Sequence, residues 1–229
     1  MIDGTIPSFV HPRKAVVSDF NNDLRPDIFV ADHGFDAAPF PGESPWLILS
    51  NPDGTYSTKY MIEHVGFHHS ASAGDLDGDG DPEIILSGWD LGNCHAEDKS
   101  ETTLKMDIHF FEANKTSTNL LDPEEFLGTS DTLGTSFLRI QDLTGDNKND
   151  LLVMSYNECP FDPHPGKLYE RVDSGFVERT IYPSVAMHEG SIVDVNLDGY
   201  PDIVGSAYTF DDESAGIDTS VYPDSLWII

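Results

Sequence analysis

Acidic side chains recur at a fixed spacing in four short segments of the chain. The segments are residues 19–27, 75–83, 142–150 and 194–202, and each reads D-x-[D/N/T]-x-D-x-x-x-[D/E]. Carboxylates crowded into nine residues repel one another, and a bound dication removes that cost. Ca²⁺ takes roughly six to eight oxygen ligands, so side chains at positions 1, 3, 5 and 9 and the backbone carbonyl at position 7 suit it. The pattern therefore predicts up to four Ca²⁺ sites.

The predicted ligands occupy the same five positions in every segment. In chain order they are Asp19, Asn21, Asp23, Arg25 and Asp27; Asp75, Asp77, Asp79, Asp81 and Glu83; Asp142, Thr144, Asp146, Lys148 and Asp150; and Asp194, Asn196, Asp198, Tyr200 and Asp202. The second segment has the fullest acid set and Gly80 at position 6, where a sharp turn favours glycine, so we expect it to bind best. The first segment has Leu24 at that position, and the third has Thr144 at position 3.

Acidic segments of this kind have two other possible structures, an EF-hand loop and an ordinary turn. An EF-hand requires Glu at position 12 and flanking helices, whereas position 12 here is Val30, Leu86, Val153 or Gly205 and the flanks predict strands. Asp-Gly segments also form ordinary turns. Four segments in register, each with acids at positions 1, 5 and 9, favour calcium over simple turns.

The residues around each acidic segment indicate short β-strands. Apolar runs such as 28–30, 84–86 and 151–153 directly follow three of the segments, and their length and composition are typical of strands buried on both faces. A second hairpin follows in each unit, for example 46–50 and 55–58 around Asn-Pro-Asp-Gly. Each unit is therefore predicted to hold four strands, a to d, with the acidic loop between a and b. Residues 122–126 predict a single helical turn.

The residues at the two ends of the chain are predicted to complete the fourth unit together. Asp3-Gly4-Thr5 matches the turn that opens strand d, and residues 226–229 match strand c. We therefore expect one domain over residues 1–229, with repeats at about 14–60, 70–127, 136–181 and 190–229 plus 1–13.

Composition excludes several classes of partner. The 229 residues carry 12 Lys+Arg against 41 Asp+Glu, a formal net charge of -29, which repels nucleic acid and anionic membranes. No apolar stretch approaches the roughly 20 residues of a membrane-spanning helix. The first residues lack the basic and apolar regions of a secretory signal. Two cysteines, Cys94 and Cys159, do not make a disulfide scaffold, although both fall in predicted b–c loops and a disulfide between neighbouring units is one option.

These loops and their flanks resemble the FG-GAP/VCBS repeats of integrin α propellers and of many bacterial secreted proteins. The resemblance implies an all-β propeller, or an arc of one, made of four-stranded antiparallel blades with calcium loops between strands a and b. It also implies an extracellular or cell-surface location. Leu24, Thr144 and the missing signal depart from the pattern, and so does the unit count, because propellers of the family commonly have about seven blades.

The b–c and d–a connections are expected at the opposite edge from the acidic loops. Candidate ligand-binding residues there are His69, Trp89, Tyr156, His188 and Tyr208. An aromatic and polar rim suits a sugar or a peptide, while ordinary loop packing is the alternative. The histidines of this edge, which include His11 and His33, offer a transition metal as a further alternative.

The sequence is compatible with two functions and with three assemblies. The leading function is a non-catalytic calcium-binding module for recognition or adhesion that binds carbohydrate or protein. The second is a carbohydrate-active lyase or hydratase that uses histidines of the same edge, although no catalytic motif supports it. The chain is expected to be an arc of a longer propeller, a closed four-bladed ring, or half of a ring made by two copies.

Overall fold

The computed structural model describes most of the strands and the four acidic segments. It describes residues 8–37, 41–60, 66–89, 108–112, 119–121, 135–155, 166–181, 187–207 and 226–228. Within these ranges the chain is all-β and antiparallel, as predicted, and no described segment is a helix long and apolar enough to cross a membrane. The helical turn predicted at 122–126, both cysteines and the strand predicted at the N-terminus lie outside the described residues.

The described strands form four antiparallel sheets. The first sheet is β1 (Pro12–Ser18), β2 (Asp27–Asp32), β3 (Trp46–Ser50) and β4 (Tyr56–Tyr60). The second is β5 (Phe67–Gly74), β6 (Glu83–Trp89), β7 (Ile108–Glu112) and β8 (Asn119–Leu121). The third is β9 (Thr135–Gln141), β10 (Asp150–Ser155), β11 (Gly166–Val172) and β12 (Gly175–Ile181). The fourth is β13 (Met187–Val193), β14 (Asp202–Ala207) and β15 (Leu226–Ile228).

Strands that follow one another in the sequence are neighbours in each sheet, so every sheet is a meander. Each acidic segment joins the first two strands of its sheet, and residues 226–228 pair with β14 as the third strand. The predicted hairpin after β3 is also present: the Gly54 amide donates to the carbonyl of Asn51 at 3.0 Å, and Gly54 has φ +81°. The order a to d is therefore confirmed in the first three sheets, and a to c in the fourth.

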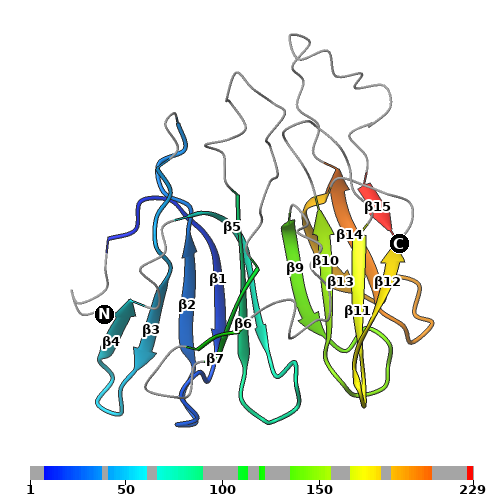
Figure 1. Cartoon of the computed structure of the whole chain (residues 1–229), viewed down its shortest axis with the longest axis horizontal. Helices are drawn as coiled ribbons and strands as arrows, with labels where there is room; N and C mark the ends of the chain where they lie inside the picture. The colour runs from blue at the N-terminus through cyan, green and yellow to red at the C-terminus, as the bar shows by residue number, and fades with distance from the viewer. Residues whose placement is uncertain are drawn as a thin grey trace.

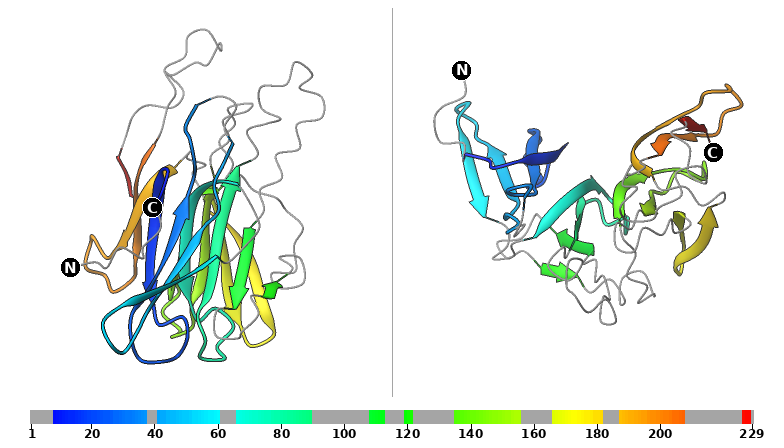
Figure 2. Two further views of the ribbon diagram at one scale, coloured as in Figure 1. Left: turned by 90° about the vertical axis from the view of Figure 1, so that its left-hand side faces the viewer. Right: turned by 90° about the horizontal axis from the view of Figure 1, so that it is seen from above.

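The sheets stand side by side in an open arc, with the first and fourth sheets at its two ends (Figure 2). Neighbouring sheets meet through their first strands, because β5 contacts β1 on one side and β9 on the other, and β9 contacts β13. Two hydrogen bonds join β5 to β9: the amides of Leu138 and Ile140 donate to the hydroxyls of Ser70 (3.1 Å) and Ser72 (2.9 Å). The acidic loops project from one edge of the arc, at the bottom of Figure 1.

The core lies between the sheets, and the second strand of a sheet fills it on both faces. Along β6, Ile84 and Leu86 pack with the first sheet, whereas Ile85 packs with the third. Along β10, Leu151 and Val153 face the second sheet, and Leu152 and Met154 face the fourth. Side chains alternate between the faces of a strand, so an unbroken apolar run results when both faces are covered. Each buried Ile or Leu contributes about 1.5–3 kcal/mol to stability.

Candidate metal centres

All four acidic loops share one backbone conformation. Positions 4 and 6 have positive φ in every loop: Asn22 (+57°) and Leu24 (+67°), Gly78 (+78°) and Gly80 (+95°), Gly145 (+80°) and Asn147 (+64°), and Leu197 (+62°) and Gly199 (+92°). Only glycine and, to a lesser degree, asparagine adopt this conformation at little cost. The sequence predicted that position 6 requires a residue that tolerates positive φ. The same requirement at position 4 was not predicted, although Asn22, Gly78 and Gly145 indicate it.

Side chains at positions 1 and 5 hold this conformation through backbone hydrogen bonds. The position 1 carboxylate accepts the position 6 amide, from Leu24 (2.7 Å), Gly80 (3.2 Å), Asn147 (2.8 Å) and Gly199 (2.9 Å). The position 5 carboxylate accepts the position 7 amide, from Arg25 (3.0 Å), Asp81 (2.8 Å), Lys148 (3.0 Å) and Tyr200 (2.9 Å). The acids at positions 1 and 5 are therefore oriented by backbone amides of their own loop.

The position 9 carboxylate anchors its loop to the sheet. It accepts the position 2 amide in every loop, from Phe20 (3.1 Å), Leu76 (2.6 Å), Leu143 (2.9 Å) and Val195 (2.8 Å). In two loops the other oxygen reaches the third strand: Asp27 accepts the Ser50 amide at 2.8 Å, and Asp150 accepts the Arg171 amide at 2.9 Å. Sequence reasoning gave this position a ligand role alone, because its partners on the third strand are distant in the chain.

The second loop concentrates negative charge most strongly. Asp75, Asp77 and Glu83 each present a carboxylate oxygen, and these oxygens lie within 4.8 Å of one another. Burial, followed by repulsion from Asp77 and Asp79, raises the pKa of Glu83 to about 7. The pKa of Asp77 is also raised, mainly by burial and then by its acidic neighbours. A cation at this point would relieve both effects, so the second loop has three carboxylates placed where they could hold one.

Basic side chains at position 7 offset part of the charge in two other loops. Arg25 forms an ion pair with Asp23, and Lys148 Nζ lies 3.6 Å from Asp146 Oδ2 and 2.8 Å from Asp173 Oδ1. The second loop has Asp81 at the same position. The charge left for a cation is therefore greatest in the second loop, and the expectation that this loop binds best stays a prediction.

In the third loop, Thr144 supplies a hydroxyl where an acid was expected. Its Oγ1 atom is buried and has no hydrogen-bond partner among the described residues. A buried hydroxyl normally finds a partner, because leaving it without one costs about 1–3 kcal/mol. A cation held between Asp142 and Asp146 would supply that partner.

Side chains also tie the loops of neighbouring sheets together. The Asn22 amide donates to Asp81 Oδ1, which joins the first loop to the second. The Arg171 guanidinium donates to the carbonyl of Asp77, and the Asn149 amide donates to the carbonyl of Asp75 at 2.9 Å. Hydrogen bonds therefore connect the first three loops along one edge of the arc.

The opposite edge gathers three histidines from two sheets. His33 follows β2 and is fully buried; its ring lies 4.6 Å from that of His11 and 5.0 Å from that of His69 in β5, centroid to centroid. The predicted rim residues Trp89 and His188 lie at the end of β6 and near the start of β13, respectively. Tyr156 and Tyr208 lie outside the described residues.

The comparison with protein families agrees with this architecture. Residues 19–86 match the model described as an FG-GAP-like repeat, which confirms the resemblance for this part of the chain. The match runs from the first acidic loop through the second loop and into β6. No curated protein matches the chain by sequence.

Proposed function

We propose that the protein is a calcium-stabilised recognition module in which the four acidic loops hold Ca²⁺. One observation carries the proposal: the second loop gathers the oxygens of Asp75, Asp77 and Glu83 within 4.8 Å, on a backbone that the other three loops repeat. Asp-Gly turns alone do not require acids at positions 1, 5 and 9 in every copy. FG-GAP repeats often bind Ca²⁺, which supports the same assignment.

The ions would act as structural elements of the scaffold. Each Ca²⁺ bound only by the folded chain adds RT ln(1+[Ca]/Kd), about 1.4 kcal/mol at roughly tenfold saturation. Four loops together would add about 6 kcal/mol, comparable to the total stability of a small domain. A chain with a formal net charge of -29 gains further from bound cations, because they reduce its self-repulsion.

Recognition would take place at the edge opposite the acidic loops. Connections on a rigid scaffold are where binding residues concentrate, and FG-GAP repeats are typical of extracellular recognition modules. The proposed ligand is a carbohydrate or a protein, met by residues such as His69, Trp89 and His188, in an extracellular or cell-surface setting. Binding on a glycan array without turnover of the bound sugar would support this function, and turnover would favour an enzyme.

Calcium dependence is tested by comparing melting temperatures in Ca²⁺ and in EGTA. The difference should be several degrees for the natural chain. Asp79→Ala should shrink that difference more than Thr144→Ala, because a carboxylate binds Ca²⁺ more strongly than a hydroxyl does. Asp53→Ala removes an exposed acid from the β3–β4 turn and should leave the difference unchanged. Identical melting curves in Ca²⁺ and EGTA would overturn the proposal.

A further inference from the structure

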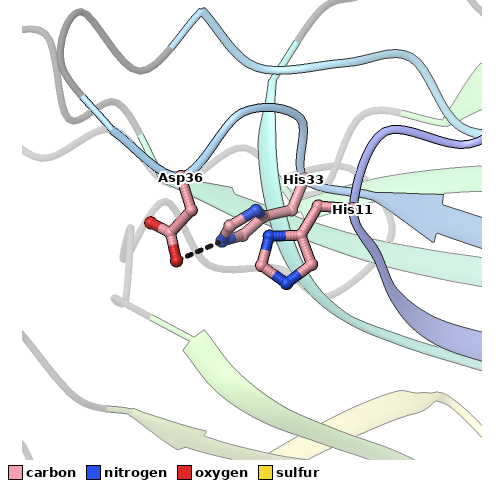
Figure 3. A group of neighbouring side chains, drawn as sticks. All are labelled: His11, His33 and Asp36. Atoms are coloured by element: carbon pink, nitrogen blue, oxygen red, sulfur yellow. Dashed lines mark ion pairs between the residues drawn. The ribbon is translucent and has the colours of Figure 1, made fainter.

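A second cluster of metal-ligating groups lies at the edge opposite the acidic loops. His11, His33 and Asp36 converge there from the chain before β1 and the connection after β2 (Figure 3). One ligand atom of each residue lies within 4.8 Å of the other two. His33 Nε2 and Asp36 Oδ2 are 4.0 Å apart. This spacing is longer than a hydrogen bond, so the two groups leave room for an atom between them.

The buried carboxylate of Asp32 fixes the backbone on both sides of the cluster. Its oxygens accept the amides of Val10 (2.8 Å), His11 (2.8 Å) and Gly34 (3.0 Å). The His33 amide also donates to the carbonyl of His11 at 3.1 Å. The two imidazoles are therefore held next to each other by main-chain bonds rather than by mutual attraction.

A tight turn brings Asp36 back toward His33. Gly34 has φ +78°, and a Cβ at this position would lie 2.4 Å from the carbonyl carbon of Gly42. No side chain fits there, so the turn can be this close only with glycine. Asp36 itself is exposed and free to make the small rotation that metal coordination needs.

The His33 ring is oriented as a metal ligand. Its Nδ1 lies 3.2 Å from the carbonyl of Gly34, so Nδ1–H is the donor and the Nε2 lone pair points toward Asp36. Metal-bound histidines usually have such a second bond to a carbonyl. Burial lowers the pKa of His33, because the charged ring is poorly solvated there.

From this geometry we propose that His11, His33 and Asp36 bind one divalent transition-metal ion, with Zn²⁺ as the best-suited ion. Two imidazoles and a carboxylate match Zn²⁺, whose bonds of about 2.0–2.1 Å place tetrahedral ligands roughly 3.3 Å apart. The observed 4.0 Å between His33 and Asp36 reaches that spacing with a small side-chain movement. Ca²⁺ prefers oxygen ligands, so this site and the acidic loops select different ions. Three protein ligands leave one position open to water or to a ligand atom.

Cobalt titration tests the site. The metal-free full chain, kept in excess Ca²⁺ to occupy oxygen-rich sites, is titrated with Co²⁺ and followed by visible absorption. One equivalent of Co²⁺ should produce the spectrum of a nitrogen- and oxygen-ligated ion, and Zn²⁺ should displace it. His11→Gln and Asp36→Asn should each weaken binding at least tenfold. Neither residue is buried, so both variants are expected to fold.

Asp53→Asn is the matched control for Asp36→Asn, because it removes one exposed acid from the same sheet at the other edge, and it should leave the titration unchanged. Circular dichroism verifies that each variant is folded. Absence of a saturable Co²⁺ spectrum in the natural chain overturns the proposal. Unchanged affinity in His11→Gln overturns it as well, since the ion would then be bound elsewhere.

Discussion

The side-chain amide of Asn149 donates to the backbone carbonyl of Asp75 at 2.9 Å, across the boundary between the third and second sheets. Asn149 occupies position 8 of the third acidic loop, and the other loops have Pro26, Pro82 and Pro201 there. This bond is therefore specific to one junction of the arc. It attaches the third loop to the first residue of the second loop.

Asn149→Ala should lower the free energy of unfolding by about 0.5–1.5 kcal/mol, the net contribution of one partly buried hydrogen bond. Urea denaturation followed by tryptophan fluorescence measures the change. Equal m-values for the natural chain and the variant would show that cooperativity is unchanged. Equal unfolding free energies for the two chains would show that the contact between the loops adds nothing to stability.

Leu24 is the strained member of its loop. It has φ +67° and is 94% exposed, so it incurs the cost of a left-handed backbone without gaining packing. Leu24→Gly should raise the free energy of unfolding by about 0.5–1 kcal/mol. The control is Val17→Gly, which removes an apolar side chain that is 62% exposed from the ordinary strand β1 and should instead destabilise the chain by about 0.5–1 kcal/mol. Urea denaturation measures both, and a loss of stability in both variants contradicts the assignment of strain to Leu24.

Much of the fold was predictable because the repeat combines two strong signals. The acids mark the turn between the first two strands, and runs such as Ile84–Leu86 mark a strand covered on both faces. Leu24 was recognised as a departure because position 6 carries glycine in two other loops. Local chemistry of this kind is visible in a sequence whenever the same unit occurs several times.

The remaining features depend on contacts between residues that are distant in the sequence, within one sheet or between sheets, and the repeat pattern does not encode them. Asp27 binds Ser50 of the third strand, so its anchoring role appears only once the sheet is assembled. The histidine cluster joins His11, His33 and His69, which occupy different positions in their repeats and come from two sheets. The repeat places these histidines at one edge of the molecule, but spacing along the chain does not show that the three rings are in contact.

Glu83 makes the stability of the calcium-free chain depend on pH. Its pKa is about 7 in the folded chain, against an ordinary value of 4.5, so the folded chain holds this proton more tightly than the unfolded chain does. The free energy of unfolding should therefore fall as pH rises from about 4.5 to about 7, with the loss complete above that range. Glu83→Gln carries no ionisable proton and can still accept the Leu76 amide, so in EGTA it should lose less stability over this range than the natural chain. Urea denaturation at several pH values measures the difference between the two chains. Saturating Ca²⁺ should reduce that difference by stabilising the carboxylate, and parallel pH profiles in EGTA would rule out Glu83 as the source.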